Sequence, residues 1–170
     1  SQGFGISCFC IIVYRKPNEA RFHGMNNAPE YCGWSQRQVI MQTNFSTLCE
    51  ILQYELWAAE RYRRYVSLVM VHAPVGIHGL KDTLDVNVRQ SDVLAYTDHT
   101  MVVLMGETDK NDALQALERY NGFLGNQFEA RFSLVTYPAD DASADALIGI
   151  AERRLQQAKS GGAGTVVCSG

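Results

Sequence analysis

The sequence predicts one α/β domain of the α+β kind, with a mainly antiparallel central sheet and helices packed on it. Apolar residues recur at helical spacing in three segments, which begin near residues 47, 111 and 143. Short runs rich in β-branched and aromatic residues lie between these segments. The chain has 170 residues, of which 46% are hydrophobic and 19% charged, so it is long and apolar enough for one core.

The N-terminal part is expected to hold a strand over residues 4–14 and a loop-rich connection over residues 15–37. We therefore divide the chain into an extension, residues 1–42, and a domain, residues 43–170. The extension is interpreted as the remnant of a preceding domain or as a docking segment. We expect the natural protein to continue upstream of Ser1, where a membrane anchor could sit.

The first long helix is predicted to begin at a capping box formed by Thr47 and Glu50 and to end near Arg64. Its apolar positions share one face: Leu48, Ile51, Leu52, Leu56, Ala59 and Tyr62. The basic residues at its end (Arg61, Arg63 and Arg64) match the helix dipole, and a lesser alternative is that one reaches a ligand held by a second subunit. The aromatic residues Trp34, Trp57 and Tyr62 are interpreted as core or interface residues.

The middle of the chain predicts three strands, over residues 67–73, 92–97 and 101–105, with a turn at residues 98–100. A second helix follows over residues 111–122, capped by Asn111. Residues 129–137 alternate as a strand that Pro138 stops. Ser143 caps a last helix, Gly161 ends it, and residues 165–168 form a final short strand.

Charge and cysteine content narrow the classes of function. The net charge of −3 and pI of about 5.8 argue against binding to a nucleic-acid polymer, but a few arginines suffice for a small anionic ligand. No apolar run is long enough to span a bilayer, and we expect a cytoplasmic domain.

Five scattered cysteines favour reduced thiols over disulfides. A zinc site is a weak alternative, because only one residue separates two of its four candidate ligands, Cys8, Cys10, His23 and Cys32.

An ordered set of short matches carries a resemblance over residues 43–167. The matching segments are Glu55–Tyr62, Ser67–Val71, Arg89–Val93, Glu107–Arg119, Ser133–Pro138 and Ser143–Lys159. In this order they resemble the GGDEF domain family, the nucleotidyl-cyclase-like palm fold of bacterial diguanylate cyclases.

The resemblance fails at the catalytic signature. Where active members carry Gly-Gly-Asp/Glu-Glu-Phe, this chain has residues 97–101, Thr-Asp-His-Thr-Met, apparently one residue shorter. Side chains replace the glycines that let the backbone approach GTP. His72 and Pro74 stand where the family has acidic residues, and imidazole is a poor magnesium ligand. We therefore predict that cyclase activity is lost, with no catalytic residue, resident metal or cofactor.

The resemblance is retained at the RxxD segment, which in many members binds cyclic di-GMP with an arginine on the following helix. Arg89, Asp92 and Arg119 match these positions, and Gln90 and Ser91 are expected to contribute less. An arginine fork fits guanine O6 and N7, and a carboxylate can accept from guanine N1–H. The alternative is a surface pair between Arg89 and Asp92 with a solvated Arg119.

The resemblance thus implies a non-catalytic cyclic di-GMP receptor. Its output would be a second-messenger process such as exopolysaccharide secretion and biofilm formation, motility or pili. We expect a protein partner in a membrane-associated or signalling complex. The sequence also leaves a homodimer as a possibility. One alternative is a ligand-free dimerisation or docking module. Another is a weakly active GTP-binding protein with a metal on His72 and Asp98, and a transition-metal pair of His72 and His99 is a further minor alternative.

Overall fold

The computed structural model describes residues 41–74, 79–80, 83, 87–97 and 99–169. The strand predicted over residues 4–14, Trp34, Asp98 and the four candidate zinc ligands lie outside these ranges. The described residues contain no helix long and apolar enough to cross a membrane.

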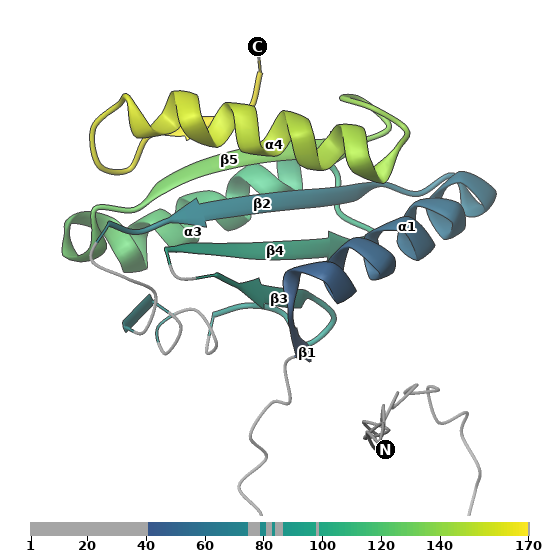
Figure 1. Cartoon of the computed structure of the whole chain (residues 1–170), viewed down its shortest axis with the longest axis horizontal. Coiled ribbons are helices and arrows are strands. Elements are labelled where there is room, and N and C mark those ends of the chain that lie inside the picture. Colours follow the sequence, from purple (N-terminus) through teal and green to yellow (C-terminus); the bar gives the residue numbers. More distant parts are fainter. Residues whose placement is uncertain (1–40, 75–78, 81–82, 84–86, 98, 170) are drawn as a thin grey trace, which may run out of the picture. The chain divides into compact units, whose positions relative to one another are not determined.

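One six-stranded sheet organises the fold, in the order β1-β3-β4-β2-β5-β6 (Figure 1). The strands are β1 (Met41–Thr43), β2 (Val66–His72), β3 (Val93–Tyr96), β4 (Thr100–Gly106), β5 (Arg131–Tyr137) and β6 (Val166–Val167). The four inner strands pair antiparallel, whereas β1 joins β3 and β6 joins β5 in parallel. The predicted mainly antiparallel sheet is therefore confirmed.

Three long helices cover the two faces of the sheet (Figure 1). Helices α1 (Phe45–Tyr62) and α4 (Ala144–Lys159) pack on one face, and α3 (Lys110–Phe128) packs on the other. The alternation of side chains along β2 explains this layering. Leu68 and Met70 join the core with α1 and α4, whereas Val69 and Val71 join the core with α3.

The helix starts differ from the predicted ones in two of three cases. Asn44 caps α1, because its side chain accepts the Thr47 N–H at 2.8 Å, so the predicted Thr47–Glu50 capping box is wrong. Asp109, and not Asn111, caps α3 through the Asp112 N–H at 2.9 Å. Ser143 caps α4 as predicted. In both failures a better acceptor stood two or three residues earlier in the chain.

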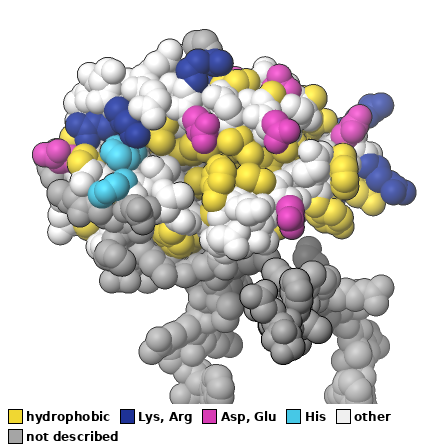
Figure 2. All heavy atoms as spheres, viewed as in Figure 1, with side chains coloured by type: hydrophobic (Ala, Val, Ile, Leu, Met, Phe, Trp, Pro, Cys, Tyr) yellow, Lys and Arg dark blue, Asp and Glu magenta, His cyan; other side chains and the backbone are white. Residues whose placement is uncertain are grey.

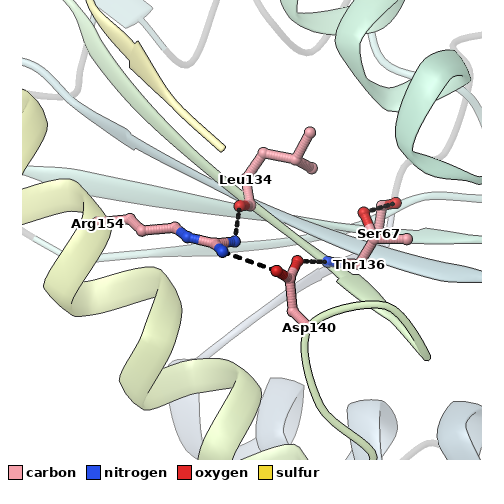
Figure 3. Close-up of polar contacts among 5 residues, drawn as sticks. All are labelled: Ser67, Leu134, Thr136, Asp140 and Arg154. Carbon is pink, nitrogen blue, oxygen red and sulfur yellow. Dashed lines mark hydrogen bonds and ion pairs between the residues drawn. The ribbon is translucent and has the colours of Figure 1, made fainter. Parts of the chain in front are cut away.

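A buried polar network ties α4 to the sheet (Figure 3). Arg154, which is 4% exposed, donates to the Leu134 carbonyl at 2.8 Å and to Asp140 Oδ1 at 2.7 Å. The other oxygen of Asp140 accepts the Thr136 N–H at 2.8 Å. The Thr136 hydroxyl lies 3.1 Å from the Ser67 hydroxyl, so the network reaches the central strand β2.

Candidate ligand-binding site

The RxxD segment forms a tight turn that leads into β3. The Asp92 N–H donates to the Arg89 carbonyl at 3.0 Å, and the Arg89 N–H donates to Asp92 Oδ2 at 3.2 Å. Gln90 and Ser91 are exposed at its corner. These reciprocal bonds mean that Asp92 holds the turn as well as carrying a charge.

Asp92 is more enclosed than the sequence indicates. The residue is only 1% exposed, and its Oδ1 atom has no hydrogen-bond partner among the described residues. Burial raises the pKa of Asp92, while the Arg89 N–H and the charges of Arg89 and Arg119 oppose that rise. Burial together with the Asp92 charge raises the pKa of Tyr120, which follows Arg119 on α3, to about 12. Both arginines thus act on a carboxylate that has one acceptor atom to spare.

An open hollow of about 420 Å³ lies beside this turn, between the turn and α3. Arg89 and Arg119 both line it, with Asp112, Gln115, Ala116 and Glu118. Neither guanidinium forms an ion pair within the described part of the chain, so the alternative of an Arg89–Asp92 side-chain pair is not what the structure has. The structure brings the two predicted arginines to one hollow, whereas Asp92, Gln90 and Ser91 are not part of its lining.

Three polar lining residues were missed by the sequence analysis. Asp112, Gln115 and Glu118 share with Arg119 the exposed side of α3 that borders the hollow. The spacing of three and four residues that puts Asp112, Gln115 and Arg119 on one helix face was the available signal. The two carboxylates limit how much negative charge the hollow can accept, and they can accept hydrogen bonds from a base.

The strand end where the family carries its metal site has a different character here. His72 pairs with Thr100 of β4 and Arg131 of β5. Burial lowers the pKa of His72, with the Lys159 charge as the next cause, so both favour the uncharged ring. The rings of His72 and His99 lie 6.3 Å apart between centroids. No three His, Cys, Asp or Glu residues in the described ranges form a group that could hold a metal ion.

A larger hollow of about 590 Å³ lies on the opposite face of the sheet, between the start of α1 and α4. Met70 and Val102 of the sheet line it, and Thr97 and Thr100 border it at the β3–β4 turn. Arg153, Lys159 and Glu152 of α4 also line it. This hollow has mixed charge and contains none of the RxxD residues.

The two aromatic residues of α1 that are interpreted from the sequence as core or interface residues both lie at the surface. Trp57 is 64% exposed and Tyr62 is 60% exposed, so neither is a core residue. The guanidinium groups of Arg61 and Arg64 lie over the Tyr62 ring, at 5.7 and 5.3 Å from its centroid. Arg64 also forms an ion pair with Glu107. The basic cluster is therefore partly engaged within its own domain.

Comparisons with known proteins bear on the fold. No protein-family model matches the sequence, and no curated protein matches it. Among solved structures, the GGDEF domain of PA1120 (YfiN or TpbB) from Pseudomonas aeruginosa has a TM-score of 0.64 at 14% identity, covering 78% of this chain and 98% of that one. The diguanylate cyclase SiaD of the same organism, in complex with its activator SiaC, has a TM-score of 0.60 at 18% identity, covering 74% of this chain and 58% of that one.

A third structure is that of a microbial GGDEF domain studied for its interaction with cyclic di-GMP. Its TM-score is 0.60 at 13% identity, and the match covers 79% of this chain and 99% of that one. All three TM-scores are at least 0.60, at identities too low to show more than the fold. The chain therefore has the fold of GGDEF domains, the fold of diguanylate cyclases.

Proposed function

We propose that this domain is a non-catalytic receptor for cyclic di-GMP, which binds at the hollow beside the RxxD turn. The observation that carries the proposal is the meeting of Arg89 and Arg119 at one hollow next to Asp92. Two guanidinium groups without an ion pair among the described residues can clamp a phosphate or face a guanine edge. Asp92 Oδ1, which has no hydrogen-bond partner among the described residues, would supply the acceptor that distinguishes guanine N1–H from adenine.

Loss of cyclase activity is the second part of the proposal. Transfer of a phosphoryl group from GTP depends on positioning and on magnesium held by hard oxygen ligands. At the end of β2 this chain offers the imidazole of His72, whose pKa is lowered by burial, and then Pro74. We infer that no resident metal or other cofactor is required, and that cyclic di-GMP is a ligand and not a product.

The receptor would act on a protein partner by population shift, because a ligand that binds one arrangement more tightly favours it. A solved cyclase of this fold binds an activator protein, which supports a protein partner here. Secretion of exopolysaccharide, motility and pili are the outputs that we propose, in the cytoplasm and at a membrane-associated complex.

Calorimetric titration with cyclic di-GMP tests the receptor site. We expect micromolar or tighter binding by the full chain, and a loss of about tenfold to a hundredfold in Arg89→Ala and in Arg119→Ala, as for the loss of one bidentate contact. Asp92→Asn is the sharper variant at the turn. Its amide oxygen can still accept the Arg89 N–H, while its NH₂ group cannot accept from guanine.

Arg153→Ala is the matched control, because it removes an exposed arginine from α4 on the other face of the sheet. Binding that survives Arg89→Ala and Arg119→Ala but is lost in Arg153→Ala would place the ligand in the larger hollow and contradict the proposal. No heat and no thermal stabilisation at a large ligand excess would favour the ligand-free docking module.

Incubation with GTP and magnesium or manganese tests the loss of activity separately. We expect no pyrophosphate release above that of a buffer blank, because the acidic metal ligands are absent from the end of β2. Turnover that His72→Ala abolishes would instead revive the GTP-binding alternative, with Arg153 and Lys159 of the larger hollow near the nucleotide.

A further inference from the structure

Helix α1 carries an exposed aromatic pair that the receptor site does not use. Tyr54 is 66% exposed and Trp57 is 64% exposed. They are three residues apart, so they lie side by side on the helix surface. Figure 2 shows hydrophobic side chains at the surface over α1, with basic side chains beside them at the C-terminal end of the helix. Two large aromatic side chains left together in water are typical of an interface.

The aromatic pair belongs to a longer seam along α1. Glu50, Tyr54, Trp57 and Arg61 are all exposed and are spaced by four, three and four residues. This is the spacing of the a and d positions in a coiled coil. The buried residues Leu48, Leu52, Leu56 and Ala59 occupy a different face of α1, against the sheet. Helix α1 therefore has one face for its own core and a second face that is free within the described residues.

The two charges at the ends of the seam have no ion-pair partner within the described part of the chain. Neither Glu50 nor Arg61 forms an ion pair among the described residues. Arg61 only lies over the Tyr62 ring, and the ion pair with Glu107 belongs to Arg64. The helix dipole explains why an acid such as Glu50 precedes a base such as Arg61 along α1. It does not explain why two exposed aromatic rings lie between them.

The seam is complementary to itself when reversed. A two-fold axis between residues 55 and 56 exchanges Tyr54 with Trp57 and Glu50 with Arg61 in an antiparallel second copy. Each ring then packs on a ring, and each unpaired charge meets its opposite. We propose that α1 is a homodimer interface, in which two copies of this chain pair antiparallel along Glu50, Tyr54, Trp57 and Arg61.

A second copy fits this surface better than an anionic membrane does, because Glu50 would be repelled by such a membrane while Arg61 is attracted. The contact is short, since each copy contributes two large rings and two charges. Interfaces below about 1,200 Å² of buried surface are typically transient. We therefore expect a dissociation constant on the order of tens to hundreds of micromolar.

Sedimentation of the full chain over that concentration range, without cyclic di-GMP, tests the interface independently of the receptor site. We expect a monomer–dimer equilibrium that Trp57→Ala weakens by more than about tenfold. Phe123→Ala is the matched control, because it removes a 49% exposed ring from α3 on the opposite face of the sheet. A monomer at every concentration, or a dimer that Trp57→Ala leaves unchanged, would overturn the proposal.

Charge exchange tests the antiparallel register. Glu50→Arg alone and Arg61→Glu alone should each weaken the dimer, because each places like charges opposite one another. An equimolar mixture of the two variants should dimerise again, since each copy then meets the opposite charge at both ends. The variant with both substitutions should also dimerise. An equimolar mixture of Glu50→Arg and Arg61→Glu that stays monomeric would refute this register. In a separate test of a membrane as the partner, vesicles of anionic lipid should bind no more of the wild type than neutral vesicles do.

Discussion

The Arg154 guanidinium shows how a charge is accommodated inside this core. Only 5% of its side chain and 14% of that of Asp140 are exposed, and the two are joined at 2.7 Å. Breaking a buried pair of this kind costs more than the pair itself contributes, because the remaining charge is left without a partner. The side chains of the pair therefore fix α4 on the sheet, although they contribute little net stability.

Acid should weaken the domain through Asp140. Burial raises the pKa of Asp140, but hydrogen bonds from Arg154 and the Thr136 N–H and the Arg154 charge outweigh it, so the pKa is lowered. A carboxylate with a lowered folded-state pKa stabilises the fold above its unfolded pKa of about 3.9, and this contribution is lost as the pH falls through the folded value. Urea unfolding between neutral and acidic pH should show this loss.

Asp140→Asn provides the comparison. At pH 7 it should lower the free energy of unfolding by about 3 kcal/mol, because the buried Arg154 loses its counter-charge. Below the unfolded pKa the difference between the variant and the wild type should shrink. Parallel stability curves at all pH values would contradict this role of Asp140.

Two of the predicted site residues are brought together by a local contact, and the third is not. Arg89 and Asp92 are three residues apart, so a turn was enough to bring them together. Arg119 lies on another element, and only the resemblance to a family pointed to it. The burial of Asp92 was not predictable, because it depends on packing against residues distant in the sequence. Trp57, interpreted from the sequence as a core or interface residue, is exposed, so the core interpretation is wrong and the interface interpretation stays a prediction.

Helix α4 is the element whose sequence signals agree best with its structure. The Ser143 hydroxyl accepts the Ala146 N–H at 3.1 Å, and Asp145 and Lys159 sit at the ends that suit their charges. The other two long helices have equally good caps, but several side chains near each start could have served. Local rules identify a helix more reliably than its first residue.

Replacement of Ser143 by alanine should remove this cap. We expect the free energy of unfolding to fall by about 1 kcal/mol, because the first turn of α4 then has an unpaired N–H group. Ser143→Asp should keep most of the stability, since a carboxylate caps equally well. Thermal unfolding of the three proteins provides the measurement. Equal midpoints for Ser143→Ala and the wild type would show that the cap is dispensable.

The end of α3 and the pairing of β1 could not be predicted from the local sequence. Helix α3 continues to Phe128 through Gly122, which costs about 1 kcal/mol in a helix, because Leu124 beyond it is fully buried. Strand β1 has only three residues and pairs in parallel with β3, about fifty residues later. In both cases the packing of distant residues decides the structure.

At the scale of the whole molecule, this chain shares its fold with solved GGDEF domains although most of its residues differ from theirs. Identities of 13–18% accompany TM-scores of 0.60–0.64 over about three quarters of the chain. A core needs apolar residues at the right period and of about the right volume, and many sequences satisfy that requirement. Fold and ligand chemistry are therefore separate questions, because the second depends on a few side chains and not on the packing of the core.

The lengths of the outer strands have a consequence for the protein at high concentration. The described sheet has seven-residue strands at β2, β4 and β5, but its margins are β1 with three residues and β6 with two. Long open margins invite foreign strands to add on, which leads to aggregation and fibres. Among the described residues, such short margins offer a foreign strand little backbone to pair with.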